Sequence, residues 1–182
     1  MRRLFAVLFA ALLLMGGSAS LVGAAAQDDA TPAPSDGATV DPAVGDTVPV
    51  VDTRGNEFVT ATVTEVIRPW EDFGEFEEPE RGTEYVAFLI EFENLTDDGI
   101  IVTPYEFRLQ DSAGFLFDPA FAQGAEDIDL APLSEDMVID GGETAEALIV
   151  FNIFEEQGLA HLFWVPENET GRLVTLAQLE GE

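Results

Sequence analysis

The stretch Glu84-Tyr-Val-Ala-Phe-Leu-Ile-Glu-Phe-Glu-Asn-Leu95 holds the densest run of β-forming residues in the chain. Successive side chains divide between two faces, as the period of two in a β-strand requires. The second face is apolar at its start and turns acidic at Glu91 and Glu93. The first face is wholly apolar, and its members are Val86, Phe88, Ile90 and Phe92. This pattern predicts a central strand of a β-sandwich, which begins deep in a sheet and ends near solvent.

Further short runs of β-forming residues lie on both sides of this stretch, with turn residues between them. We therefore predict an all-β fold, an antiparallel β-sandwich of about eight strands. The pattern alone does not exclude a closed β-barrel. A helical turn is expected at most near 120–125, and Asn94–Gly99 is expected to form a hairpin turn. The strand segments are 47–51, 57–67, 84–95, 100–103, 105–110, 115–117, 137–140, 143–153, 161–165 and 172–179.

The chain begins with segments that look unlike the rest. Residues 1–26 join a basic head to an apolar helix former and end in Ala24-Ala-Ala26, which predicts a secretory signal peptide. An uncleaved membrane anchor is the alternative, because the apolar part could just span a bilayer. Residues 27–42 are rich in Ala, Asp, Thr and Pro and are expected to be a disordered linker. Residues 43–182 then form the single β-sandwich domain.

Composition sets limits on partners and on chemistry. The sequence has 36 acidic residues; removal of Arg2 and Arg3 with the leader leaves five Arg, a net charge of −31. Such a surface repels nucleic acid and anionic membranes, so nucleic acid is not an expected partner, and the mature domain is not expected to contact a membrane unless the leader stays uncleaved. The chain has no Cys, which excludes disulfides, thiolate metal sites, a Cys nucleophile and a lipid-modified cysteine. The ordinary interpretation of the acidity is that it keeps an exported protein soluble.

A series of short motifs along the domain resembles a known family. They suit turns and strand ends: Asn94 is placed to bond local backbone, and Gly114 to adopt a positive φ. The motifs are Val44-Gly-Asp46, Val63-Thr-Glu-Val66, Pro79-Glu-Arg-Gly-Thr-Glu-Tyr-Val-Ala87, Phe92-Glu-Asn94, Phe107-Arg-Leu-Gln-Asp-Ser-Ala-Gly114, Gly141-Gly-Glu-Thr144 and Val150-Phe151. Together they look like the immunoglobulin-like domain of unknown function found in bacterial secreted proteins and lipoproteins, which is similar in fold to a secreted mycobacterial immunogenic antigen.

This resemblance implies an immunoglobulin-like sandwich and an extracellular or cell-surface location. It implies no catalytic residues. Many members of that family are anchored through a lipid-modified cysteine, and this chain departs from them because it has none.

The loop Trp70-Glu-Asp-Phe-Gly-Glu-Phe-Glu-Glu-Pro-Glu80 is the most suggestive segment for binding. It interleaves six carboxylates with three aromatic rings, and recognition commonly lies on loops held by a rigid scaffold. Exposed rings beside carboxylates could stack a sugar or an aromatic side chain, or hold a basic peptide. The alternative is that the rings cap the end of the core while the acids stay solvated. The candidate ligand-binding residues are Trp70, Glu71, Asp72, Phe73, Phe76 and Glu78.

Other chemistry has weaker support. His161 is the only histidine and is expected to be structural. Carboxylates at Asp97-Asp98 and Glu126-Asp-Ile-Asp129 suggest calcium only loosely, because no EF-hand spacing is present. A paired-carboxylate glycosidase would need two acids at a fixed separation in a cleft, and with 36 acids some pair is always available. No cofactor or metal site is expected.

The sequence therefore predicts a secreted or cell-surface immunoglobulin-like module that is not an enzyme. Its partner would be an unidentified protein or envelope component, or its role would be structural. Two alternatives stay open: a calcium-dependent adhesive module and a carbohydrate-active enzyme that uses paired carboxylates.

Overall fold

The computed structural model describes residues 41–126, 128–166 and 172–179. The predicted signal peptide and nearly all of the predicted linker lie outside these residues. The described residues form ten strands and one short 3-10 turn: β1 (Thr47–Val51), β2 (Glu57–Ile67), β3 (Thr83–Asn94), β4 (Ile100–Val102), η1 (Pro104–Glu106), β5 (Phe107–Asp111), β6 (Leu116–Phe117), β7 (Met137–Ile139), β8 (Thr144–Phe154), β9 (Leu159–Trp164) and β10 (Val174–Gln178).

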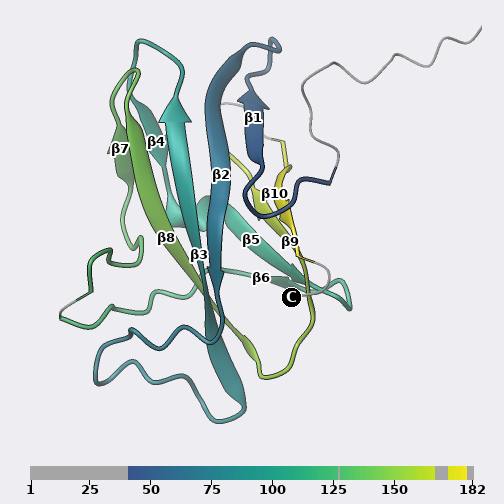
Figure 1. Cartoon of the computed structure of the whole chain (residues 1–182), viewed down its shortest axis with the longest axis vertical. Coiled ribbons are helices and arrows are strands. Elements are labelled where there is room, and N and C mark those ends of the chain that lie inside the picture. Colours follow the sequence, from purple (N-terminus) through teal and green to yellow (C-terminus); the bar gives the residue numbers. More distant parts are fainter. Residues whose placement is uncertain (1–40, 127, 167–171, 180–182) are drawn as a thin grey trace, which may run out of the picture. The chain divides into compact units, whose positions relative to one another are not determined.

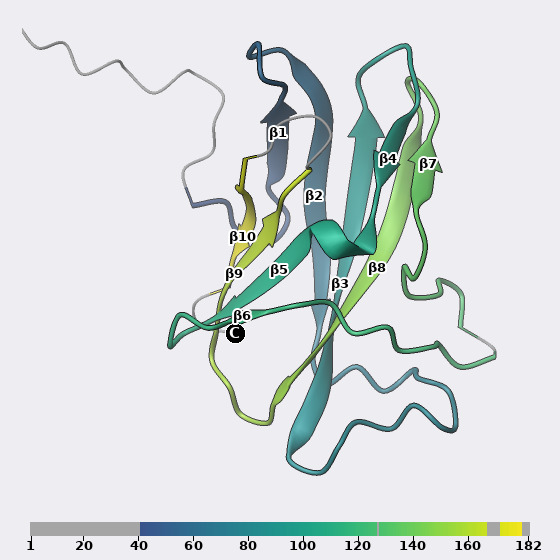
Figure 2. The same ribbon diagram turned by 180° about the vertical axis from the view of Figure 1, so that it is seen from behind.

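Two four-stranded antiparallel sheets make up the sandwich (Figures 1 and 2). One sheet has the order β1-β2-β3-β8, and the other has the order β10-β9-β5-β6. A separate two-stranded sheet pairs β4 with β7. The prediction of an all-β antiparallel sandwich is therefore confirmed for the described residues.

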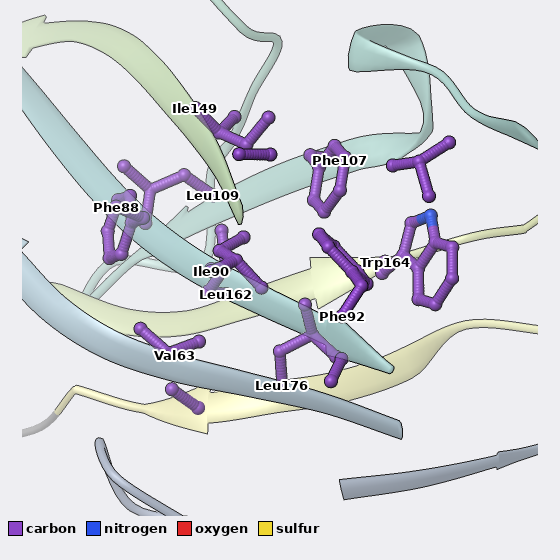
Figure 3. Packing of buried hydrophobic residues seen from close by; sticks show 14 of the residues in the cluster. Val63, Phe88, Ile90, Phe92, Phe107, Leu109, Ile149, Leu162, Trp164 and Leu176 are labelled. Carbon is purple, nitrogen blue, oxygen red and sulfur yellow. The ribbon is translucent and has the colours of Figure 1, made fainter. Parts of the chain in front are cut away.

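The main core lies between the two large sheets (Figure 3). The four apolar side chains that the sequence assigned to one face of β3 are all fully buried in it. Phe92 lies near the end of β3, and the centroid of its ring is 5.2 Å from that of Trp164 in an edge-to-face arrangement. Phe107 stacks on the same indole. Trp164 Nε1 donates to Glu106 Oε2 at 2.9 Å, so this buried carboxylate satisfies a buried indole donor.

A second, smaller core lies on the outer face of the β1-β2-β3-β8 sheet. It is built on Tyr85 and Ala87 of β3, with Leu148 and Val150 of β8, and Trp70 covers them. Trp70 is only 1% exposed; its ring meets Phe73 and Tyr85 edge to face, with centroids 6.2 and 6.0 Å apart. The first half of β3 is therefore buried on both faces, because loops cover the face that the second sheet does not.

Asn94 ties two turns together where β3 ends. Its Nδ2 donates to the carbonyls of Asp98, Ile139 and Asp140 at 2.7, 3.0 and 3.1 Å, so two hydrogens serve three acceptors. Its Oδ1 accepts from the Thr96 backbone N–H at 3.0 Å. These bonds confirm the expected local role of the amide and hold the turn after β3 against the turn between β7 and β8.

The segment after Asn94 differs from the prediction of a hairpin. β4 pairs with β7 rather than returning along β3, and Ile100 and Val102 enter the main core. The donors of Asn94 bind carbonyls at Ile139 and Asp140, which directs the chain toward β7. The strand expected at 105–110 starts at Phe107, because Pro104–Glu106 form η1 with a capping box at Thr103. The segment 120–125 forms no helix.

Prolines occupy both outer edges of the β1-β2-β3-β8 sheet. Pro49 lies in the middle of β1, where an edge position needs no donor toward solvent. Along β8, Pro119 and Pro132 form isolated bridges with Phe151 and Leu148. The adjoining N–H groups of Ala120 and Leu133 donate to carbonyls of β8, so the connection from β6 to β7 covers this edge.

Replacement of Asn94 by Leu should lower the free energy of unfolding by about 2–4 kcal/mol, because buried carbonyls lose their donor. Asn152 provides the matched control: its Oδ1 is buried and makes no hydrogen bond within the described residues. Asn152→Val should leave stability within about 1 kcal/mol or raise it. Urea unfolding measures both. Equal losses in the two variants would contradict this account of Asn94.

Trp70→Ala should cost about 3–5 kcal/mol, as is usual for a fully buried indole. Phe76→Ala should stay within about 0.5 kcal/mol, because that ring is 91% exposed. Thermal and urea unfolding of the two variants separate a ring that caps a core from a ring that does not. Equal stability of both variants would contradict the role of Trp70 as the cover of a second core.

Candidate functional site

Two loops far apart in the sequence meet on the outer face of the β1-β2-β3-β8 sheet. One connects β2 to β3, and the other is the long connection from β6 to β7; Figures 1 and 2 show them side by side. The backbone N–H of Gly74 donates to the Gln123 carbonyl, and that of Ala125 to the Asp72 carbonyl, both at 2.8 Å. The two loops thus hold each other.

The first loop is also fixed at its base. Arg68 Nη2 lies 2.6 Å from Glu84 Oε1, and its Nε lies 3.0 Å from the same oxygen. The backbone N–H of Trp70 donates to the Tyr85 carbonyl at 2.8 Å, which places the indole over β3. Burial raises the pKa of Tyr85 above its ordinary value, and the Glu77 carboxylate adds to the effect.

The structure divides the six residues predicted to bind a ligand. Trp70 is buried, Phe73 is half-buried against it, and the other four are exposed. The rings at 70 and 73 therefore cap a core, while the ring at 76 projects outward. Of the six, Trp70 and Asp72 line a groove; Glu71, Phe73, Phe76 and Glu78 do not.

This groove has a volume of about 430 Å³ and lies between the sheet and the two loops. Its floor is aliphatic, from Ile67 of β2, Leu89 of β3 and Leu148 of β8. Residues of both loops form its walls: Trp70 and Asp72 on one side, Ile128, Asp129 and Leu130 on the other. Glu65 completes the lining. The three acidic residues of the groove are exposed to solvent: Glu65, Asp72 and Asp129. We call this surface the outer-face groove.

Most residues of the outer-face groove were not predicted as site residues. The long connection was expected to be irregular, and Asp129 was considered only for calcium. The one available signal was Leu89, an apolar residue on the face of β3 that turns acidic. Contacts between residues distant in sequence decide which part of the connection packs above Leu89. The local pattern of residues contains no information on such contacts.

Metal and histidine chemistry find little support. Among the residues that the structure describes, no group of three or more His, Asp or Glu side chains could hold a metal ion. His161 Nδ1 donates to Gln110 Oε1 at 3.1 Å, and the imidazole ring stacks on Phe163. In the described ranges there is also no helix long and apolar enough to cross a membrane.

The buried carboxylates serve the fold. Asp111 Oδ1 accepts the N–H groups of Ala113 and Phe115 at 2.9 and 2.7 Å, which shapes the turn before β6. Gly114, at φ 89°, completes that turn as expected. A further cavity of about 180 Å³ lies beside Glu106 and Trp164, and there the carboxylate holds the indole.

Comparisons with known proteins bear on the fold. No protein-family model and no curated protein matches the sequence. Several solved structures resemble the chain, and three of them follow. The yjhA protein from Bacillus subtilis has a TM-score of 0.51 at 14% identity, covering 72% of this chain and 85% of its own. The ycdA protein of Bacillus subtilis, named as a candidate lipoprotein, has a TM-score of 0.54 at 13% identity, covering 78% of this chain and 39% of its own.

The third is MPT63, a secreted protein from Mycobacterium tuberculosis, with a TM-score of 0.53 at 11% identity, covering 78% of this chain and 96% of its own. At such identities the likeness concerns the fold. It supports the resemblance drawn from the sequence motifs: the chain has the immunoglobulin-like β-sandwich of a domain of unknown function, shared with a secreted mycobacterial protein.

Proposed function

We propose that this protein is an exported, non-enzymatic module, secreted or held at the cell surface, that binds a protein or envelope component through the outer-face groove. The groove is the single observation that carries the proposal. Two separate loops close on one sheet and leave an aliphatic floor open to solvent, and concave apolar surfaces with a few polar groups are typical of binding sites.

The placement of the acids supports binding over catalysis. The two buried acids that the structure describes, Glu106 and Asp111, have structural donors as partners. The acids of the groove are solvated at its margin. An apolar floor with solvated carboxylates can hold a partner, but it offers no acid in an apolar pocket of the kind that a glycosidase uses.

The sheet edges support recognition by side chains. A partner that adds a strand needs a free row of backbone donors and acceptors. Pro49 interrupts that row on β1, and the connection with Pro119 and Pro132 occupies it on β8. On this sheet, the face with the groove is therefore a better surface for a partner than either edge.

Export is tested by fractionation of cells that express the full chain. The chain should appear in the medium or on the cell surface, and a chain that lacks residues 2–26 should stay in the cytoplasm. Immunoblots of each fraction give the result, with a cytoplasmic protein as the control. Equal distribution of the two chains would contradict the proposed location.

Binding is tested with the exported full chain and an envelope fraction from the same cells. We expect saturable retention, and Leu130→Asp should weaken it about tenfold, because a carboxylate then enters an apolar contact. Leu95→Asp is the matched control, since Leu95 is 43% exposed and lies outside the groove. Equal retention of both variants would move the binding surface elsewhere, and no saturable retention would refute the function.

A further inference from the structure

Three residues that line the outer-face groove form a single row across three strands. Glu65 of β2 pairs in register with Leu89 of β3, and Leu89 pairs with Leu148 of β8. Neighbouring strands lie about 4.8 Å apart, so the row spans about 10 Å. A row of that length suits one or two side chains of a partner.

The next row along the same face is acidic. Glu91 of β3 and Glu146 of β8 are register partners, and both are exposed. Neither side chain makes a hydrogen bond or an ion pair within the described part of the chain. Like charges directly opposite each other in an antiparallel pair destabilise it, so this pair costs the sheet stability without a compensating contact.

The two rows stand at a defined distance. Leu89 and Glu91 are two residues apart on one strand, which is about 6.8 Å. An extended peptide that runs along β3 repeats its own side chains at the same spacing. An apolar side chain in the groove would thus bring the side chain two positions away opposite the Glu91–Glu146 pair.

We propose that the outer-face groove and the Glu91–Glu146 pair form one site for an extended, cationic amphipathic peptide segment, with an apolar residue in the groove and Arg or Lys two positions away. This inference rests on the proposed function and names its partner class. Charge complementarity carries it: Glu65, Asp72 and Asp129 surround the apolar floor, and Glu91 and Glu146 continue the negative field along the strand.

Two other ligand classes fit less well. An anionic segment would meet five carboxylates on this face and the field of a chain with a formal charge of −29. A neutral sugar is commonly held by stacking on an exposed aromatic ring, whereas Trp70, the one ring in the lining of the groove, is only 1% exposed and offers no free face.

The test uses four extended peptides with the repeats Leu-x-Arg, Leu-x-Gln, Leu-x-Glu and Ser-x-Arg, titrated at fixed salt into the ¹⁵N-labelled full chain. We expect Leu-x-Arg to bind saturably and to shift the amides of Leu89 and Glu91 and the Trp70 indole N–H. Leu-x-Gln and Ser-x-Arg should each bind about tenfold more weakly, because each lacks one half of the recognition.

The variant Glu91→Gln with Glu146→Gln provides a second readout. It should weaken Leu-x-Arg binding about fivefold and at the same time raise the midpoint of thermal unfolding, because the like-charge pair is gone. Glu57→Gln with Glu155→Gln is the matched control, since both acids are exposed and lie outside the groove. It should leave binding and stability unchanged.

The outcomes separate the two proposals. Equal binding of Leu-x-Gln and Leu-x-Arg at the groove would overturn the cationic partner and keep the groove as a binding surface. Equal binding of Ser-x-Arg and Leu-x-Arg would mean that the peptide is attracted only by the overall negative charge, and it would overturn the site. An effect of the control variant equal to that of the Glu91 and Glu146 variant would have the same meaning. If no peptide shifts groove residues while Leu130→Asp still weakens envelope retention about tenfold, the partner class is wrong and the proposed function stands.

Discussion

A strand that is apolar on both faces needs a cover on both faces, and this requirement at the start of β3 governs the rest of the structure. The second sheet covers one side of the strand. On the other side, burial of Tyr85 and Ala87 requires Trp70 and the two loops. Each fully buried large apolar side chain contributes about 1.5–3 kcal/mol, so a sandwich without the loops would expose a costly surface.

The loops cover only part of that face, and the groove is where their cover ends. Along β3 the outward side chains change from Tyr85 and Ala87, which are buried, through Leu89, which is half-buried, to Glu91, which is exposed. The position of the groove therefore follows from the length of apolar sequence on the second face of one strand. Fold stability and the candidate site share this single gradient.

Much of the fold could be predicted from the sequence, because alternation along a strand is a local property. The apolar face of β3, the amide role of Asn94 and the positive φ of Gly114 follow from neighbours within a few residues. The partner of β4 could not be predicted, since it depends on hydrogen bonds between Asn94 and carbonyls 45 and 46 positions away. Gly141 shows the same limit: a Cβ there would lie 2.3 Å from the Asp97 carbonyl oxygen, a packing constraint that no turn pattern contains. For the same reason the sequence indicated one loop of the site but not the connection that completes the groove.

The prolines on the two edges of the first sheet also affect how the protein behaves at high concentration. A chain without cysteines has no disulfides against partial opening, and exposed sheet edges are the templates from which aggregates and amyloid grow. Pro49 on one edge, and Pro119 and Pro132 along the other, remove backbone donors where a second molecule would attach. We therefore expect the three prolines to disfavour association at these two edges, in addition to the mutual repulsion of highly charged molecules. Unlike that repulsion, which salt screens within about 8 Å, the effect of the prolines does not depend on salt.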